Sequence, residues 1–223
     1  MPIKAFVFDC GGVILGNPDL SRYHAWEDRL GLQRDELATR LYEGTAWRRA
    51  EVGELTEDAY WTEAGKELGL GDSHVVEALK NDMWDSWTIN PRTLDLIDRV
   101  RQRHRVAILS NATDVLRTAL AERYGIADRF DCIISSADVG VAKPERGIYE
   151  IALERLALAP EQIVFIDDRP DNVAAAANLG MHVIWFVNDD LLARQMQRYL
   201  QTPAVPSDTE LEEGGNGHNV NGD

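Results

Sequence analysis

At 223 residues, the chain is long enough for one complete core, or for a core domain with a smaller insert. Its formal net charge of -15 argues against binding to nucleic acid or to anionic membranes, because clustered Lys and Arg side chains bind phosphate backbones. No apolar stretch approaches the 18 residues of a membrane span, and no signal-peptide pattern is found. We therefore expect a cytoplasmic globular protein, a class that includes enzymes.

Short apolar runs of the buried-strand type alternate with helical patterns along most of the chain. Strands are predicted at residues 3–8, 106–109, 132–135, 163–166 and 182–187, and helices at residues 92–103, 113–124, 145–156, 172–179 and 191–200. This alternation predicts an α/β fold, a Rossmann-like doubly wound parallel sheet with helices on both faces. Right-handed crossovers place the carboxyl ends of all strands at one edge, where such sheets bind ligands.

Residues 16–88 interrupt the alternation with helical patterns alone, which predicts a helical cap inserted after the first strand. The core is then formed by residues 1–15 together with 89–201. The insert holds five of the six tryptophans, Trp26, Trp47, Trp61, Trp84 and Trp87; they suit a domain that closes over a pocket, although ordinary packing between helices is the alternative for each. Residues 202–223 have five acidic residues and no Lys or Arg, which predicts a disordered tail.

Polar side chains follow four of the predicted strands at the ligand-binding edge. In strand order they are Asp9, Ser110 with Asn111, Lys143, and Asp167 with Asp168. A helix N-cap explains Ser110 by itself, and an exposed position explains Lys143 by itself. Two adjacent carboxylates at a buried strand end are costly unless a cation or hydrogen bonds offset their charge, which indicates a metal site.

Together, these side chains are typical of phosphoryl transfer. The Asp9 carboxylate can attack phosphorus, while the Ser110 hydroxyl and the Lys143 ammonium hold phosphate oxygens. Mg²⁺ suits ligands that are all oxygen atoms. The sequence therefore predicts a magnesium-dependent phosphatase that acts on a small phosphorylated metabolite through an aspartyl phosphate.

The same positions resemble the haloacid dehalogenase superfamily of hydrolases, in the subfamily IA form with a C1 helical cap. The resemblance implies that Asp9 is the nucleophile and a metal ligand, and that Asp167 and the Gly11 carbonyl also bind the metal. It implies that Ser110, Asn111, Lys143 and the Gly12 backbone contact the substrate, and that Asp168 and Asn172 support the metal ligands. Residues 9–13, 143–149 and 167–172 resemble, more narrowly, the bacterial α-D-glucose-1-phosphatase branch.

Position 11 departs from the pattern of this superfamily. Most of its phosphatases have an aspartate two residues after the nucleophile as general acid and base, whereas this chain has Gly11. General acid-base help is typically worth about 10² to 10⁴ in rate. A leaving group that needs less protonation, such as that of a sugar 1-phosphate, would tolerate the loss. An L-2-haloacid dehalogenase, which needs no metal, and a catalytically weak binding protein are the alternatives.

Substrate specificity is expected to come from the insert, with Trp47 as a stacking surface and Arg48 or Arg49 as anion contacts; a solvated charged face is the alternative. Asn172 is also predicted to begin a helix as a cap. Cys10 and Cys132 are interpreted as small buried hydrophobic residues, and the histidines form no cluster typical of a zinc site. We expect a monomer or a homodimer.

Overall fold

The computed structural model describes residues 1–200, so the tail expected at residues 202–223 lies outside the described part of the chain. Its centre is a five-stranded sheet in the order β3-β2-β1-β4-β5, and every pairing is parallel. The strands are β1 (Ala5–Phe8), β2 (Arg105–Ser110), β3 (Cys132–Ser135), β4 (Ile163–Asp167) and β5 (His182–Trp185). The predicted strands and the Rossmann-like fold class are confirmed, with strand bounds that shift by two residues at most.

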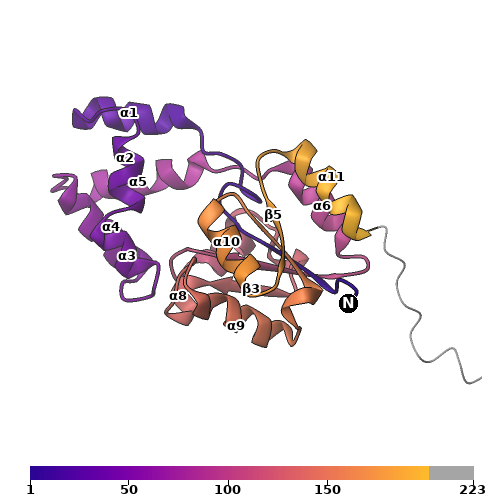
Figure 1. Ribbon diagram of the computed structural model, residues 1–223. Helices are drawn as coiled ribbons and strands as arrows, with labels where there is room; N and C mark the ends of the chain where they lie inside the picture. Colours follow the sequence, from indigo (N-terminus) through magenta and orange to yellow (C-terminus); the bar gives the residue numbers. More distant parts are fainter. Residues whose placement is uncertain (201–223) are drawn as a thin grey trace, which may run out of the picture.

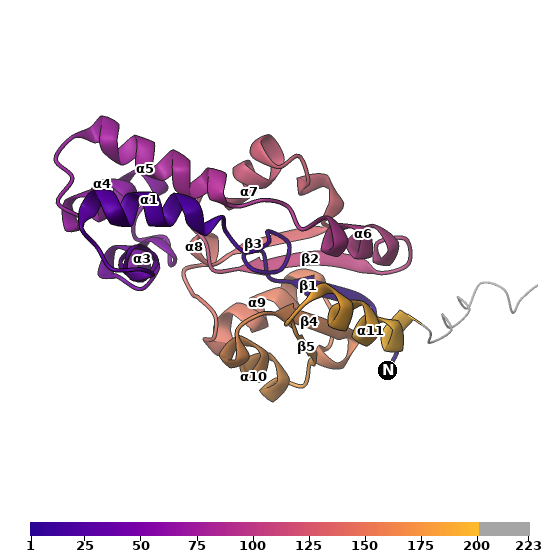
Figure 2. The same ribbon diagram turned by 90° about the horizontal axis from the view of Figure 1, so that it is seen from above.

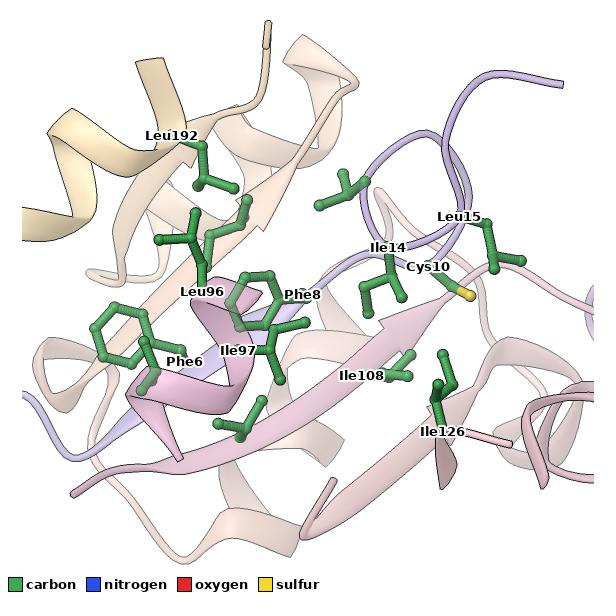
Figure 3. Close-up of a cluster of buried hydrophobic side chains, with 14 of the residues drawn as sticks. Phe6, Phe8, Cys10, Ile14, Leu15, Leu96, Ile97, Ile108, Ile126 and Leu192 are labelled. Atoms are coloured by element: carbon green, nitrogen blue, oxygen red, sulfur yellow. The ribbon is translucent and has the colours of Figure 1, made fainter. Parts of the chain in front are cut away.

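Residues of β1 alternate between the two faces of the sheet, and both faces are covered. Phe6 and Phe8 pack in one cluster with α6 (Pro91–Val100) and α11 (Asp189–Leu200), as Figure 3 shows. Ala5 and Val7 lie in a second cluster with α9 (Arg146–Leu156) and α10 (Pro170–Asn178). Helices consequently flank the sheet (Figure 2), and burial on both faces explains why the strands are continuous apolar runs in the sequence.

A proline at the first helical position marks the start of both α6 and α10, but only α6 also has a side-chain cap. The Asn90 side chain accepts hydrogen bonds from the backbone N–H groups of Arg92 and Thr93, and Pro91 occupies the first helical position. Helix α10 begins at Pro170, so Asn172 lies inside the helix and the expectation that it forms the cap was wrong. Its side chain is instead turned to the β4 carboxylate described below.

The predicted helix at residues 113–124 is shorter and irregular. It consists of α7 (Leu116–Thr118) and a π-helical turn η1 (Ala119–Arg123), because the side chains of Thr113 and Asp114 are used in contacts with Glu57. The remaining short elements are η2 (Ala127–Arg129), α8 (Ser136–Val139) and η3 (Pro160–Gln162). Within residues 1–200, no helix is long and apolar enough to cross a membrane.

Five helices between β1 and α6 form a group beside the sheet, which we call the helical lobe (Figure 1). They are α1 (Leu20–Leu30), α2 (Glu36–Tyr42), α3 (Thr45–Ala50), α4 (Glu57–Glu67) and α5 (Ser73–Ser86). The lobe has its own hydrophobic cluster, which includes Leu37, Leu79 and Met83. It stands near the edge at which β1 and β4 end, and a cavity lies between the two parts.

Candidate active site

The carboxyl ends of β1 and β4 lie side by side in the middle of the sheet. Asp9 directly follows β1, and its backbone N–H donates to the Ile166 carbonyl at 2.8 Å. Asp167 is the last residue of β4. From β1 the chain continues to β2 and β3 on one side, whereas β4 and β5 lie on the other, so this is the point at which the strand order reverses. Ligands of open α/β sheets bind at such points.

Lys143 joins the two carboxylates. Its Nζ lies 2.8 Å from Asp9 Oδ1 and 2.7 Å from Asp167 Oδ2, and the lysine side chain is 1% exposed. Burial alone would lower the pKa of Lys143, but the Asp9 and Asp167 carboxylates outweigh that effect and raise it. Lys143 is therefore a fixed ammonium ion in a buried site, and the alternative that it is simply exposed is excluded.

Burial raises the pKa of Asp9 to about 7, since the contact with Lys143 only partly offsets desolvation and the Asp167 charge adds to the shift. Burial and the Asp167 charge also raise the pKa of Asp168. The three aspartates and Lys143 carry three negative charges and one positive charge when ionised. This excess of two negative charges is what a divalent cation would neutralise.

Hydrogen bonds hold Asp167 in place. Asn172 Nδ2 donates to both of its oxygens, at 3.0 and 3.1 Å, and the Arg169 backbone N–H donates to Oδ1 at 2.8 Å. Asn172 is almost fully buried. The residue thus orients a carboxylate at the site rather than capping the helix.

The residues at this edge fit a magnesium ion. One carboxylate oxygen each from Asp9, Asp167 and Asp168 can be chosen so that the three atoms lie within 4.8 Å of one another. Opposite ligands of Mg²⁺ lie about 4.2 Å apart, because each ligand is at about 2.1 Å, and oxygen atoms are the ligands that this ion prefers. Small side-chain adjustments would bring the three carboxylates to a common ion.

The two glycines after Asp9 differ in what they allow. Gly12 has φ +79°, and a Cβ there would lie 2.4 Å from Asp168 Oδ2, so a side chain would displace that carboxylate. A Cβ at Gly11 would have Trp87 ring carbons at 3.8 and 3.9 Å as its nearest neighbours. Position 11 therefore has room for a side chain, and the absence of a carboxylate is not imposed by crowding.

Ser110 and Asn111 lie beside this cluster but use their side chains differently. Ser110 is buried at the end of β2 and lines the cavity with Asp9 and Lys143. The Asn111 side chain donates to the Lys143 carbonyl and accepts from the Lys143 N–H, both at 2.8 Å. Asn111 therefore positions the Lys143 backbone. It also lines the cavity, and its expected contact with substrate stays a prediction.

The cavity above the cluster has a volume of about 380 Å³ and is lined by residues of both parts of the molecule. From the sheet edge come Asp9, Ser110, Lys143 and Asp168; the helical lobe contributes several tryptophans and tyrosines. Trp47 lines the cavity as expected and lies on helix α3.

The arginines expected beside Trp47 do not line this cavity. Arg48 is exposed, and Arg49 pairs with Glu63 at 2.8 Å, because the 100° rotation per residue in α3 turns both away from the face that carries Trp47. That expectation was wrong. Arg169, which directly follows the aspartate pair, is the arginine among the cavity residues.

Glu57 at the start of α4 is a cavity residue that the sequence analysis missed. It is 5% exposed, and its carboxylate accepts hydrogen bonds from Trp61 Nε1 at 2.7 Å, from Trp84 Nε1 at 2.9 Å and from the Thr113 hydroxyl. Its position in the first helical turn resembled an ordinary exposed glutamate, which favours the helix dipole. The sequence offered one indication of the contact between Glu57 and Trp61: the two residues lie four positions apart, which places them on the same face of a helix.

The haloacid dehalogenase-like hydrolase family matches residues 3–180 of this sequence. The chain belongs to this family. A sesquiterpene phosphatase of Aspergillus oryzae is 28% identical over 80% of this chain and 87% of its own length. The chain spans about half or less of the length of seven other curated relatives that it matches.

Solved structures of the haloacid dehalogenase-like family share the fold. A hydrolase of Porphyromonas gingivalis superposes with a TM-score of 0.73 at 25% identity, over 91% of this chain and all of the other. A Bacteroides thetaiotaomicron member, solved with magnesium and inorganic phosphate, gives a TM-score of 0.68 at 24% identity, over 82% of this chain and 93% of the other. Family membership confirms that the chain is a hydrolase with the core fold expected.

Proposed function

We propose that this chain is a magnesium-dependent phosphatase that hydrolyses a small phosphate monoester through an aspartyl phosphate on Asp9. The observation that carries the proposal is the buried Asp9–Lys143–Asp167 cluster, which lies where the strand order of the sheet reverses. With Asp168, the cluster has more negative than positive charge, as a site for a divalent cation requires. Two comparisons support the proposal: one relative is a phosphatase, and one family member was solved with magnesium and inorganic phosphate.

The two carboxylate oxygens of Asp9 would have different roles. Oδ1 accepts from the Cys10 N–H at 2.7 Å and pairs with Lys143. Oδ2 would attack phosphorus: the new Oδ2–P bond forms as the bond from phosphorus to the leaving oxygen breaks. Water then attacks the aspartyl phosphate, which releases inorganic phosphate and restores the carboxylate. Lys143 and Ser110 would hold non-bridging phosphate oxygens during both steps.

The ion would be held by Asp9, Asp167 and the Gly11 carbonyl, with Asp168 in support. When bound, Mg²⁺ supplies positive charge to the phosphate oxygens and lowers the pKa of its carboxylate ligands.

The leaving group must depart with little help from the protein, because Gly11 offers no proton. A sugar 1-phosphate is the substrate that the sequence favoured, since an anomeric oxygen is a better leaving group than an ordinary alkoxide. Four further expectations stay predictions. They are the similarity to the glucose-1-phosphatase branch, the C1 cap subfamily, the cytoplasmic location, and a monomeric or homodimeric state.

Hydrolysis of p-nitrophenyl phosphate with Mg²⁺, with EDTA, and with EDTA followed by excess Mg²⁺ tests the proposal. Activity should vanish with the chelator, return with the ion, and be lost in Asp9→Asn. An L-2-haloacid dehalogenase would instead release halide from 2-chloropropionate in the presence of EDTA. Equal, near-background rates for the wild type and Asp9→Asn would favour a binding protein without catalytic activity.

A further inference from the structure

We propose that the substrate is a phosphate monoester of an apolar phenol, bound with its phosphate on the Asp9–Lys143 cluster and its ring among the tryptophans of the helical lobe. The inference rests on the proposed phosphatase function and names its substrate class. It departs from the sugar phosphate that the sequence favoured.

Most of the residues that line the cavity away from the aspartate cluster have aromatic or aliphatic side chains. The aromatic ones are Trp47, Trp61, Trp84, Trp87, Tyr42 and Tyr60. Leu15, Met83 and Leu116 lie beside them. Flat aromatic faces bind apolar rings, and rings prefer offset or edge-to-face contacts with one another. A wall of this composition suits an apolar ring better than a hydrated sugar.

The polar atoms of four of these six aromatic residues are already used within the protein. Trp61 and Trp84 donate their indole N–H groups to Glu57. Tyr60 donates its hydroxyl to the Leu41 carbonyl at 2.8 Å, and the Tyr42 hydroxyl lies 3.3 Å from that of Tyr23. These residues therefore present mainly carbon surfaces to the cavity, because their donors are engaged elsewhere.

Few polar side chains remain to bind sugar hydroxyl groups. The amide of Asn111 is committed to Lys143, that of Asn172 to Asp167, and the hydroxyl of Thr113 to Glu57. Away from the aspartate cluster, the other polar lining residues are Asn17, Glu51 and Arg169. A buried polar pocket that recognises a sugar needs a partner for each hydroxyl, since an unpaired one loses its bonds to water without compensation.

Trp87, one of the aromatic lining residues, lies beside position 11, where most phosphatases of this family have the aspartate that acts as general acid. Its ring is the nearest group to the side-chain position of Gly11, at 3.8 Å. A leaving group beside Gly11 would therefore meet an indole ring where most family phosphatases have a carboxylate. A phenol has a pKa of about 10, as for tyrosine, whereas water has a pKa of about 16 and ordinary alcohols are similarly weak acids. A phenol-type leaving group thus departs as its anion without a proton donor.

The size of the cavity agrees with this class. Its volume of about 380 Å³ is at the lower end of ligand pockets, which typically measure about 300 to 1,000 Å³. One or two fused rings with a phosphate group fit this space.

A substrate panel tests the inference: phenyl phosphate, 1-naphthyl phosphate, glucose 1-phosphate and glucose 6-phosphate, each assayed with Mg²⁺ for kcat/KM. We expect both aryl phosphates to exceed both sugar phosphates at least tenfold. n-Hexyl phosphate, which is apolar but has a poor leaving group, should be hydrolysed slowly yet inhibit competitively at least tenfold better than inorganic phosphate. Glucose 1-phosphate turnover equal to that of the aryl esters would overturn the inference and leave the phosphatase proposal intact.

Direct binding separates the two proposals. Calorimetric titration of the Asp9→Asn protein in Mg²⁺ should give a Kd for 1-naphthyl phosphate at least tenfold below that for inorganic phosphate, a difference of about 1.4 kcal/mol. Equal dissociation constants would overturn the aromatic site even if the wild type is an active phosphatase. Conversely, tight naphthyl phosphate binding without any turnover by the wild type would overturn the phosphatase proposal alone.

Substitutions of Trp87 test where the ring lies. Trp87→Leu should raise KM for 1-naphthyl phosphate about tenfold while the inhibition constant of inorganic phosphate stays within twofold, which also shows that the phosphate site is intact. Trp87→Phe retains an aromatic ring and should stay within about threefold of the wild type for both values. Equal KM values for all three proteins would contradict the placement of the ring beside Gly11.

Discussion

The carboxylate of Glu57 accepts a hydrogen bond from the Thr113 hydroxyl, although 56 residues separate them in the chain. Glu57 begins α4 of the helical lobe, whereas Thr113 follows β2 of the core. A second hydrogen bond joins the same two segments, because the Glu57 backbone N–H donates to Asp114 Oδ1 at 2.8 Å. Glu57 thus joins the lobe to the sheet edge and also orients two indole rings of the cavity.

Replacement of this carboxylate should destabilise the protein. Glu57→Gln places an amide N–H₂ group among three donors, and an unsatisfied buried polar group costs about 1–3 kcal/mol. Urea unfolding should show that loss in the free energy of unfolding. Asp58→Asn, the next residue with a side chain 90% exposed, is the matched control and should change stability by less than about 0.5 kcal/mol. Equal losses in both variants would contradict the role of Glu57.

Introduction of an acid at position 11 should broaden the range of leaving groups. Gly11→Asp has space beside the Trp87 ring, and general acid catalysis typically contributes about 10² to 10⁴ in rate. We expect kcat for n-hexyl phosphate to rise at least tenfold, whereas kcat for phenyl phosphate rises less. Gly12→Ala serves as the contrasting variant, since its Cβ would meet Asp168 and activity should fall. A uniform change for both substrates in Gly11→Asp would argue against proton donation.

The stability of the metal-free protein should depend on Asp9 and on pH. Burial raises the pKa of Asp9 from 3.8 to about 7, so the folded state favours the protonated carboxyl. That contribution is complete below about pH 4 and is lost as pH rises toward 7, at ~1.4 kcal/mol per pKa unit. In EDTA, Asp9→Asn should therefore gain in Tm over the wild type between pH 4 and pH 8.

Addition of Mg²⁺ provides the control for that comparison. Ligand binding to the folded state alone raises stability, so the ion should raise the Tm of the wild type at pH 8 more than that of Asp9→Asn. A difference between the two proteins in EDTA that is constant across this pH range would show that Asp9 does not titrate there.

Loss of the Asn111 side chain should weaken the site through Lys143. Asn111→Ala removes two hydrogen bonds to the Lys143 backbone, and we expect kcat/KM for phenyl phosphate to fall at least tenfold. Asn17→Ala removes another amide that lines the same cavity but makes no such bond in the described part of the chain, and it should change kcat/KM by less than about threefold. Comparable losses in both variants would contradict the positioning role.

The sequence alone determined the sheet and the position of its ligand edge. Buried strands are continuous apolar runs, and each run ends where a polar residue begins, as Phe8 is followed by Asp9 and Ile166 by Asp167. These are local patterns, and the parallel arrangement then brings all strand ends together without further information.

Only the tertiary structure decided how individual side chains are used. Arg169 rather than Arg48 or Arg49 lines the cavity, Asn111 and Asn172 hold protein groups, and Glu57 joins the lobe to Thr113. Each of these outcomes depends on which distant segment supplies the partner and on the rotation of a helix about its axis. A residue's own sequence neighbourhood does not contain that information: the partners of Asn111 and Glu57 lie 32 and 56 residues away, and even the nearby pair Asn172 and Asp167 meets only because the turn after β4 brings the two together.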